Sequence, residues 1–335
     1  MGDVTMIKEA LTYDDVLLVP QYSDIMSRKD VDTSCSLGPF KFKIPIIAAN
    51  MDKICESKMA IAIGKLGGLG VIHRFNTIEQ QVEEAKKVKV EGLIVAIALG
   101  LKDLEERAKA MKDIADIFVI DIAHGHTKSM IEAITYLKKN YKQYIIAGNI
   151  ATRNAREDLI QAGTNCVKVG IGPGSVCQTR SVTGCGVPQI TAIQEVAEYK
   201  TVDIIADGGI KTSGDIVKAL AAGATMVMLG NLLSGTDETP GDIQTASDGS
   251  KHKYYRGMAS KEASNREDVT PEGISIIVPY KGPVENVIDF LIGGLRSGMT
   301  YNGAKTIKEL QQKAQFIKVT SHGAWESTDR TKRHG

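Results

Sequence analysis

The chain has 335 residues, of which 43% are hydrophobic and 24% are charged, so it can bury a full core and is neither disordered nor fibrous. Lysine and arginine total 41 and aspartate and glutamate total 40, which leaves a net charge of +1. That balance excludes nucleic-acid binding by phosphate neutralisation as the main function. An aromatic content of only 5% excludes a base-stacking platform as well.

Membrane and secretion signals are not expected from the sequence. No apolar run approaches the roughly 18 residues of a membrane span, and the chain does not begin with the pattern of a secretion signal. The five cysteines are odd in number and form no Cys-x-x-Cys pair, so neither a disulfide framework nor a zinc finger is expected. These features favour a reducing cytoplasm.

Short runs rich in β-branched residues recur along the chain and predict eight strands. They are Ile44–Ala49, Gly70–His73, Leu93–Ala98, Ile117–Asp121, Tyr144–Gly148, Cys166–Gly170, Val202–Ala206 and Met226–Gly230. Stretches with helical spacing separate several of them, namely Ile78–Lys89, Leu104–Lys112, Ser129–Lys139, Asn154–Ala162 and Ser213–Ala222. This alternation predicts parallel strands, and eight such units favour a closed (β/α)₈ TIM barrel over an open sheet.

Two segments do not fit the repeat. Residues 1–40 precede the first strand and are expected to be an extended lead-in. Leu232–Pro283 follows the eighth strand, is largely polar, and has the length of a functional flap, although a disordered surface insertion is the alternative. Leu291–Ser297 and Ile307–Gln315 then predict the last helices. We therefore expect one barrel domain over residues 1–335 with a flap at 232–283.

Glycine-rich segments follow three of the predicted strands, where a TIM barrel places its active site. Gly170–Arg180 follows the sixth strand, Asp207-Gly208-Gly209 the seventh, and Gly230-Asn231 the eighth. Glycines let backbone N–H groups approach an anion closely, and Ser175 adds a hydroxyl. These segments predict a phosphate site, unless the glycines serve only as turns.

Two aspartates at the same rim suggest riboses. A bare carboxylate at Asp207 would repel a phosphate, so its expected partner is a pair of ribose hydroxyls, which makes the ligand a nucleotide monophosphate. Asp121 ends the fourth strand and is placed to bind a second ribose, as in a dinucleotide. Because no GxGxxG occurs in a βαβ context, such a cofactor would not be held in Rossmann fashion. His124 and His126 give only a weak zinc signal, with no third ligand evident.

One of the cysteines is a candidate nucleophile. Cys177 lies in the glycine-rich loop near Arg180, and surroundings of N–H donors and positive charge favour a thiolate. Cys166 lies within a predicted strand, where a cysteine is most often a small core residue. The same interpretation applies to Cys35, Cys55 and Cys185.

Several motifs, in order, resemble the IMP dehydrogenase/GMP reductase family. They are LTYDDVLLVP at Leu11–Pro20, PIIAANMD at Pro45–Asp52, GGLGVIH at Gly67–His73, AGNI at Ala147–Ile150, GIGPGSVCQTR at Gly170–Arg180, VPQITAI at Val187–Ile193, ADGGI at Ala206–Ile210, YRGM at Tyr255–Met258, PEG at Pro271–Gly273 and GGLRS at Gly293–Ser297. The resemblance covers nearly the whole chain. It implies a TIM barrel assembled as a homotetramer that acts on a purine nucleotide monophosphate, GMP or IMP, with a nicotinamide cofactor.

The resemblance also implies site residues. Cys177 matches the cysteine that bonds to C2 of the purine as a thioimidate, Thr179 matches a threonine that helps proton transfer, and Glu272 matches a glutamate at the purine edge. The nucleotide-binding positions that match are Met51, Asn149, Gly174, Ser175, Asp207, Gly209, Gly230, Asn231, Tyr255, Gly257 and Met258. The positions implied for the cofactor are Asp121, Ala123, His124, Gly170 and Gly172. A potassium site is implied at the backbone carbonyls of Gly172, Gly174 and Cys177.

The two activities of the family differ after the thioimidate, and the sequence favours the reductase. Gly257 and Glu272 are separated by only 14 residues without the Arg-Tyr pair with which the dehydrogenases activate water. Lys87–Gly92 leaves no room for the regulatory module that many dehydrogenases insert. Ala48-Ala49-Asn50 and Thr300-Tyr301-Asn302-Gly303 look like the reductase branch, whereas VPQITAI, YYRGMAS and GLRSGM look like the dehydrogenase.

We therefore expect a GMP reductase that uses NADPH. The alternatives are an IMP dehydrogenase without the regulatory module, which would use NAD, and a nucleotide-binding paralogue with little or no turnover. A flavin-dependent barrel would also use phosphate loops, and a yellow colour of the purified protein would reveal it.

Overall fold

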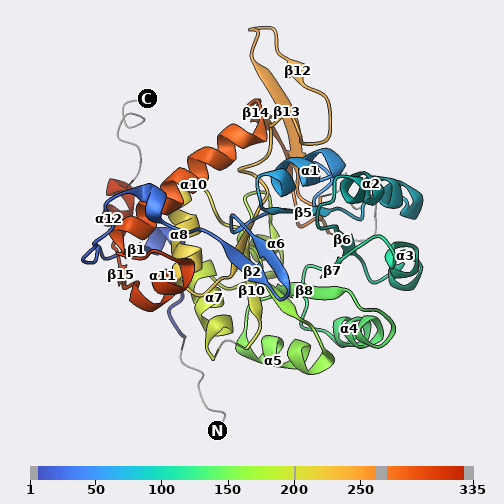
Figure 1. Ribbon diagram of the computed structural model, residues 1–335, viewed down its shortest axis with the longest axis horizontal. Helices are drawn as coiled ribbons and strands as arrows, with labels where there is room; N and C mark the ends of the chain where they lie inside the picture. The colour runs from blue at the N-terminus through green and yellow to red at the C-terminus, as the bar shows by residue number, and fades with distance from the viewer. Residues whose placement is uncertain (1–6, 200, 261–269, 328–335) are drawn as a thin grey trace.

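The computed structural model describes residues 7–199, 201–260 and 270–327, and its centre is a closed barrel of eight parallel strands (Figure 1). The strands follow one another around the ring in chain order. They are β4 (Ile46–Ala48), β5 (Leu69–Ile72), β6 (Ala96–Leu99), β7 (Ile117–Asp121), β8 (Tyr144–Ile150), β9 (Cys166–Val169), β10 (Asp203–Asp207) and β11 (Met226–Leu229). The predicted TIM barrel is confirmed, and each predicted strand lies within a few residues of an observed one.

The strand residues are buried because helices cover the outer face of the barrel and side chains fill its interior. Every residue of β4, β5, β6, β9 and β11 is buried. This explains why the strands read as continuous apolar runs instead of alternating patterns. The exception is Lys168 in β9, a charged residue that is only 2% exposed.

Helices surround the barrel and follow the strands. They are α1 (Ser57–Lys65), α2 (Ile78–Val90), α3 (Leu104–Met111), α4 (Lys128–Asn140), α5 (Arg153–Ala162), α7 (Gln189–Ala197), α8 (Ser213–Ala221) and α10 (Val284–Tyr301). A capping box starts α8: the Thr212 hydroxyl accepts from the N–H of Asp215, whose carboxylate accepts from the N–H of Thr212. The predicted helix Leu291–Ser297 is the centre of the longer α10. The other α-helices of the described residues are short: α6 (Thr179–Thr183), α11 (Ile307–Lys313) and α12 (Ser321–Glu326).

None of the helices in the described ranges combines the length and the apolar character that a membrane span requires.

The N-terminal segment contains short strands, so it is more than an extended lead-in. β1 (Val16–Leu18) pairs with β15 (Phe316–Lys318) near the end of the chain. β2 (Cys35–Leu37) and β3 (Phe40–Phe42) form a hairpin that lies across the middle of the ring in Figure 1. At its turn the N–H of Gly38 donates to Asp203 Oδ2 at 2.8 Å, where β10 begins. The hairpin therefore covers the amino-terminal end of the barrel.

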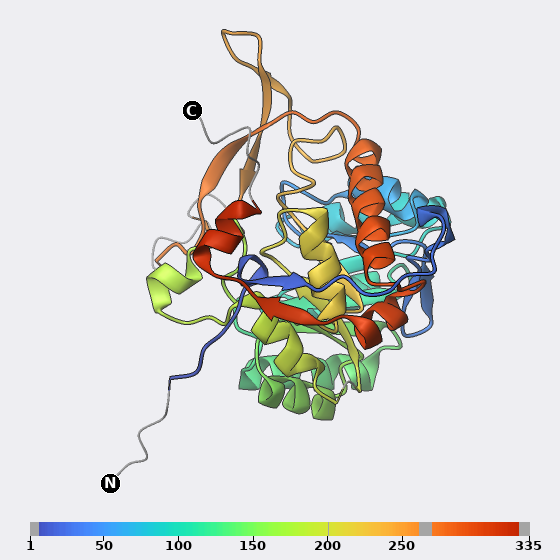
Figure 2. The same cartoon turned by 90° about the vertical axis from the view of Figure 1, so that its left-hand side faces the viewer.

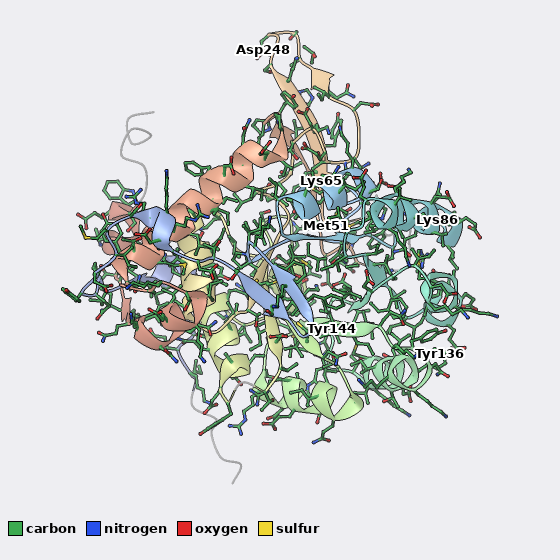
Figure 3. The ribbon with its side chains drawn as sticks, viewed as in Figure 1. Met51, Lys65, Lys86, Tyr136, Tyr144 and Asp248 are labelled. Atoms are coloured by element: carbon green, nitrogen blue, oxygen red, sulfur yellow. The ribbon has the colours of Figure 1, made fainter. Side chains whose placement is uncertain are left out.

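The segment between β11 and α10 contributes a three-stranded antiparallel sheet. Its strands are β12 (Gln244–Thr245), β13 (Lys251–Arg256) and β14 (Ser275–Pro279). Figure 2 shows this sheet standing away from the helices, and Asp248 marks its tip in Figure 3. Lys253 is buried and donates to the carbonyls of Thr236 (3.0 Å) and Thr239 (2.6 Å), which fastens the sheet to the chain leaving β11.

Candidate active site

The loop after β9 brings Cys177, Thr179 and Glu272 into one hydrogen-bonded series. Cys177 Sγ lies 3.1 Å from Thr179 Oγ1, and that hydroxyl donates to Glu272 Oε2 at 2.7 Å. Because the Thr179 hydroxyl donates to the carboxylate, its oxygen is free to accept the thiol proton. The arrangement can pass a proton between the sulfur and Glu272.

Backbone hydrogen bonds fix this series in place. The N–H of Gln178 donates to the Glu272 carbonyl at 2.6 Å, and the N–H of Ile274 donates to the Val176 carbonyl at 3.1 Å. On its other side the Glu272 N–H donates to the carbonyl of Ala259 at 3.0 Å. Glu272 thus lies between the cysteine loop and the chain that leaves β13.

Arg180 braces the cysteine loop. We expected its guanidinium beside the thiol, but its hydrogen bonds go to the carbonyls of Ile171 (3.4 Å) and Val187 (2.7 Å), at the two ends of the loop. Gly172 passes close to this side chain at φ +80°, and a Cβ there would lie 2.5 Å from Arg180 Cγ. A glycine is therefore required where the loop folds around the arginine.

A buried lysine joins the two aspartates that we expected to bind riboses. Lys168 Nζ lies 2.6 Å from Asp121 Oδ1 and 2.7 Å from Asp207 Oδ2. Burial alone would lower the pKa of Lys168, but the two carboxylates outweigh it and raise that pKa. For Asp121, burial pushes the pKa up while Lys168 and a hydrogen bond from Asn50 push it down, and the net direction is down. Lys168 and Asp121 are therefore both charged at neutral pH.

Asn149 enters this cluster through an irregularity in its strand. The register of β8 against β9 shifts between Gly148 and Ile150, which leaves Asn149 outside the regular ladder. Its side-chain amide donates to the carbonyl of Gly170 at 2.7 Å and to Asp207 Oδ2 at 3.0 Å, and its oxygen accepts from Lys168. The side chains of Asp121 and Asp207 are each 21% exposed, so both carboxylates remain reachable from the mouth.

Glycines predicted to hold a phosphate line the same rim. Gly208 and Gly209, after β10, have φ of +93° and +80° and pack against Pro173 of the cysteine loop. After β11, a Cβ at Gly230 would lie 2.9 Å from the Tyr255 hydroxyl and 3.2 Å from Met51 Sδ. A side chain larger than glycine would fill the space where these loops meet. Glycine leaves this space open, and a close approach of backbone N–H groups to an anion requires such space.

Tyr255 connects the flap to this rim. The side chain is 3% exposed, and its hydroxyl lies 3.6 Å from Met51 Sδ. Burial raises the pKa of Tyr255, a hydrogen bond with Ser175 lowers it, and Asp207 raises it, with a net rise. The hydroxyl therefore stays protonated, with its proton directed at Met51 Sδ and its oxygen toward Ser175.

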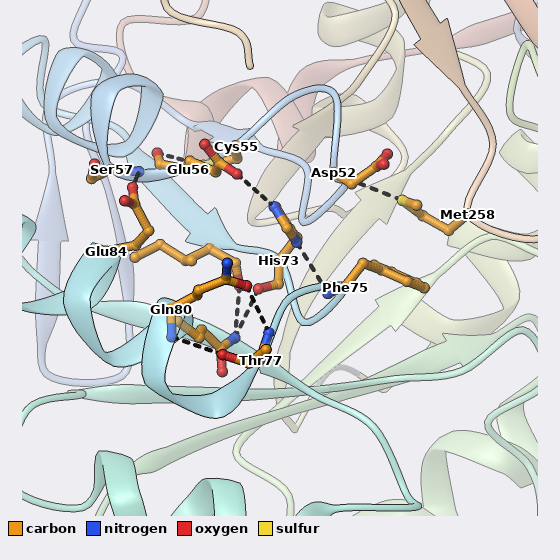
Figure 4. A network of polar contacts seen from close by, with 12 residues as sticks. Asp52, Cys55, Glu56, Ser57, His73, Phe75, Thr77, Gln80, Glu84 and Met258 are labelled. Carbon is orange, nitrogen blue, oxygen red and sulfur yellow. Dashed lines mark hydrogen bonds and ion pairs between the residues drawn. The ribbon is translucent and has the colours of Figure 1, made fainter. Parts of the chain in front are cut away.

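The other predicted nucleotide positions flank this centre. Gly174 is next to Ser175, and its carbonyl accepts from the N–H of Cys177 at 3.1 Å. Asn231 is exposed, and its carbonyl accepts from Lys281 at 3.1 Å. Gly257 donates its N–H to the carbonyl of Ile274 at 3.0 Å, so it joins the backbone around Glu272. Met258 Sδ accepts from the N–H of Asp52 at 3.2 Å, as Figure 4 shows.

Of the predicted cofactor positions, Asp121 ends β7 and Ala123 and His124 follow it, whereas Gly170 and Gly172 lie in the loop after β9. Ala123 and His124 are exposed next to Asp121. His126 pairs with Asp158 of α5, Nε2 to Oδ2 at 2.7 Å, so it has a structural partner. The described residues contain no group of three or more His, Cys, Asp and Glu side chains arranged to hold a metal ion. A cation at this rim would have to rely on backbone carbonyls.

The cysteines other than Cys177 follow the core interpretation with one exception. Cys55 and Cys166 are completely buried, and Cys35 is half-buried against the core. Cys185 is exposed in the loop that follows α6, so its assignment to the core was wrong. The periodicity of hydrophobic residues in the sequence did not indicate that Cys185 lies in an exposed loop between α6 and α7.

Sequence reasoning missed two charged contacts of the rim. Lys168 stands in an otherwise apolar strand, and that isolated charge was the signal that could have revealed it. The pair formed by Asp52 and Arg256 joins the loop after β4 to the end of β13. No spacing rule connects residues so far apart in the chain, so only the fold reveals this pair.

The fold and the site together define a class of protein: a TIM barrel whose carboxyl-terminal rim combines glycine-rich loops, two lysine-bound carboxylates and a cysteine linked through a threonine to a glutamate. The sequence model of the "IMP dehydrogenase / GMP reductase domain" matches residues 10–330. The chain belongs to this family of purine-nucleotide oxidoreductases.

Relatives named as dehydrogenases and a relative named as a reductase are about equally similar to the chain. It is 35% identical to an inosine-5'-monophosphate dehydrogenase of Nitrosopumilus maritimus, with 96% of this chain and 98% of that protein aligned. It is also 35% identical to a GMP reductase of Leishmania major, with 98% of both chains aligned. An inosine-5'-monophosphate dehydrogenase of Cryptosporidium parvum is 37% identical, with 96% of this chain and 95% of that protein aligned.

Proposed function

We propose that the protein is a GMP reductase, which converts GMP to IMP and ammonia with NADPH through a covalent bond between Cys177 and C2 of the purine. The observation that carries the proposal is the Cys177–Thr179–Glu272 series, combined with a chain between Gly257 and Glu272 that lacks an Arg-Tyr pair. The only arginine of that segment, Arg266, is followed by Glu267 and lies outside the described residues.

The nucleotide would lie across the rim from the glycine loops to the cysteine. Backbone N–H groups around Gly209 and Gly230 would hold the phosphate, together with Ser175 and Tyr255. Asp207, fixed by Lys168 and Asn149, would accept hydrogen bonds from the ribose hydroxyls. Met51 and Met258 would contact the purine.

The first step would exchange nitrogen for sulfur at C2. The sulfur of Cys177 adds to C2, the bond from C2 to the exocyclic amine breaks, and ammonia leaves. The thiol proton passes through the Thr179 hydroxyl, 3.1 Å from the sulfur, to Glu272 and from there to the departing nitrogen. The protein side of this step needs no activated water.

The second step would exchange sulfur for hydrogen at C2. The hydride comes from the nicotinamide cofactor, which is the chemistry that this group supplies when bound. Asp121 fits such a cofactor, because Lys168 and Asn50 fix its carboxylate at the rim while 21% of the side chain stays exposed. Ala123 and His124, which follow Asp121, would line the rest of the cofactor site together with Gly170 and Gly172 of the loop after β9. The thiolate of Cys177 is released at the end, so one GMP and one NADPH are consumed for each IMP and ammonia.

IMP dehydrogenase activity with NAD is the second candidate. The motifs VPQITAI, YYRGMAS and GLRSGM favour it, and dehydrogenases of several organisms are as similar to this chain as the reductase is. That reaction uses the same cysteine but must hydrolyse the adduct, so an activated water is required. The described residues offer Glu272 near the sulfur for that purpose, without the Arg-Tyr pair.

Two assays on one preparation distinguish the candidates. The first follows NADPH oxidation with GMP, and the second follows NAD reduction with IMP, both by absorbance of the reduced nicotinamide. We expect turnover in the first and at most trace activity in the second. Activity confined to the second assay would refute the reductase, and binding of IMP without turnover in either would indicate a silent paralogue.

We also propose that this chain shares the family's potassium site, oligomeric state and cellular location. A potassium ion would bind the carbonyls of Gly172, Gly174 and Cys177, since carbonyl oxygens suit a hard cation and the Gly174 carbonyl keeps a lone pair beyond its bond to Cys177. The assembly would be a homotetramer in the cytoplasm, where the five thiols, none in a disulfide, are stable. Replacing potassium with sodium in the assay buffer tests the first point, and light scattering tests the second.

A further inference from the structure

An ion pair joins the loop after β4 to the flap. Arg256, the last residue of β13, donates from Nε to Asp52 Oδ2 at 2.8 Å, and its Nη2 contacts the same oxygen. Asp52 lies in the loop after β4 and is only 8% exposed, while the arginine side chain is 26% exposed. The second carboxylate oxygen, Oδ1, is buried and has no hydrogen-bond partner among the described residues. Arg256 is therefore what holds this carboxylate.

Both members of the pair are next to predicted nucleotide contacts. Asp52 follows Met51, and its N–H donates to Met258 Sδ at 3.2 Å (Figure 4). Arg256 stands between Tyr255 and Gly257, and the Tyr255 hydroxyl reaches back to Met51 Sδ at 3.6 Å. Two soft sulfur contacts and one ion pair thus connect the same two stretches of chain.

The ion pair is the strongest of these connections. Contacts to thioether sulfur are weak, whereas hydrogen bonds between a guanidinium and a carboxylate are charge-assisted. A buried carboxylate without its cation is costly, so the loop and the strand end are held in the one arrangement that keeps Asp52 and Arg256 together. Loss of the arginine would release both.

The connection continues to the reacting cysteine through the backbone. The N–H of Gly257 donates to the carbonyl of Ile274 at 3.0 Å, and the N–H of Ile274 donates to the carbonyl of Val176 at 3.1 Å. Val176 precedes Cys177. The position of Arg256 is therefore coupled to both sides of the purine site: Met51 on one side, and the cysteine loop on the other.

We propose that Asp52 and Arg256 form a positioning pair that locks the end of β13 onto the loop after β4, so that Met51, Tyr255 and Met258 close around the purine nucleotide. The inference rests on the proposed function only in taking a purine nucleotide as the ligand of those residues. Neither member of the pair touches the reacting atoms, so the pair acts on nucleotide affinity more than on chemistry.

Calorimetric titration of GMP and of IMP into the intact protein tests the pair directly. R256M should weaken the affinity for both nucleotides at least roughly tenfold, and D52N should weaken it less, because the asparagine oxygen still accepts from the arginine. The double variant D52N/R256M should bind no worse than R256M, since the pair is already broken. R256K should recover part of the lost affinity.

A matched control lies in α3, outside the proposed nucleotide contacts. Arg107 of α3 donates from Nε (2.9 Å) and Nη2 (2.6 Å) to one oxygen of Asp103, the same geometry at 4% exposure. R107M should lower the melting temperature yet leave GMP and IMP affinity within about twofold of the wild type. At saturating GMP, R256M should keep kcat within about fivefold while KM rises at least tenfold.

The outcomes separate the inference from the function on which it rests. Unchanged nucleotide affinity in both R256M and R256K, with a lower melting temperature as in R107M, would show the pair to be structural only and would overturn the inference. So would a loss in kcat at an unchanged KM, or a double variant much weaker than either single one. A wild-type protein that binds neither GMP nor IMP would refute the proposed function, and this inference with it.

Discussion

The two ends of the barrel are built from the same eight strands, yet their polar groups are arranged for different purposes. At the amino-terminal end the hydroxyl of Tyr144 donates to Asp203 Oδ2 at 2.9 Å, and the N–H of Gly38 donates to the same oxygen. The other oxygen of Asp203 accepts from Thr225 at 3.3 Å. At the carboxyl-terminal end Lys168 holds Asp121 and Asp207 with part of each carboxylate still exposed.

The difference shows where stability and binding are located. The closed end pairs neutral donors with one carboxylate under a covering hairpin, so it contributes to stability and leaves little to bind a ligand. At the open end, charged side chains, glycines and a thiol lie close together, and part of the Asp121 and Asp207 carboxylates stays exposed to a ligand. Substitutions at the closed end should therefore change stability without changing kinetics. At the open end, substitutions of the reacting and binding groups should change kinetics, and loss of the buried Lys168 should lower stability as well.

The largest effect is expected at the open end, from C177A. Without the sulfur no bond to C2 can form, so turnover should fall on the order of 10⁴-fold or more, whether the reaction is that of the reductase or that of the dehydrogenase. The melting temperature and the affinity for IMP should stay close to those of the wild type. NADPH oxidation with GMP, together with calorimetry, checks both points. Retained turnover would remove Cys177 from the mechanism.

E272Q should be the next most damaging substitution. The amide cannot accept a proton from Thr179, so kcat should fall roughly 10²- to 10³-fold while KM for GMP changes little. T179V should produce a loss of similar size, and the double variant should be little worse than either, because the two residues act in one series. Independent, multiplying losses in the double variant would contradict the relay.

K168M tests the buried charges of the rim through pH. The raised pKa of Lys168 stabilises the fold fully below about pH 10.4, and this contribution is lost as the pH rises further; the lowered pKa of Asp121 stabilises it above about pH 3.9, and this is lost as the pH falls. At pH 7 the variant should lose about 3 kcal/mol of unfolding free energy. Denaturant titrations at several pH values measure it.

In those titrations the deficit of K168M should narrow below about pH 4, because protonation then neutralises Asp121, which the variant leaves without its cation. A deficit that is constant from pH 3 to pH 10 would mean that the lysine acts through packing and not through charge.

D207A should weaken nucleotide affinity roughly 10- to 100-fold, the loss of one or two charge-assisted hydrogen bonds to the ribose. Because Lys168 keeps Asp121 as a partner, the fold should survive. Calorimetry with GMP and IMP provides the measurement. An affinity equal to that of the wild type would place the sugar elsewhere.

The smallest effect is expected at the closed end, from Y144F. Removal of the hydroxyl deletes its shared hydrogen bond to Asp203 Oδ2 (2.9 Å) and to the Asn165 carbonyl (3.2 Å), and should cost about 1 kcal/mol of unfolding free energy. Burial, Cys166 and Asp203 all raise the pKa of Tyr144, so the cost should be the same throughout neutral pH. KM and kcat should be unchanged. A change in either would show that the two ends are coupled.

The barrel could be predicted from the sequence because its signals are local. Each buried strand is a short apolar run, and features such as the Thr212 cap and Gly223 mark helix ends independently of the rest of the chain. The position of the glycine-rich loops could be predicted for the same reason, since glycines follow three strands at one rim. The order of the elements then fixes which residues share that rim.

What could not be predicted depends on contacts between distant segments. The hairpin at 35–42 covers the barrel only because Gly38 reaches Asp203, and Arg180 braces its loop only because the loop folds back. Lys168 gave a signal, but its partners Asp121 and Asp207 lie on two other strands. The choice between reductase and dehydrogenase is not local either, because both chemistries use the same cysteine.

The central claim is that Cys177 lies ready to bond to a purine anchored by Asp207 and the glycine loops. A crystal structure of the protein with IMP tests it most directly. We predict C2 of the purine within about 3.5 Å of the Cys177 sulfur, with the ribose hydroxyls on Asp207. A purine that lies well beyond contact distance of that sulfur, or a thiol turned into the barrel core, would contradict the account.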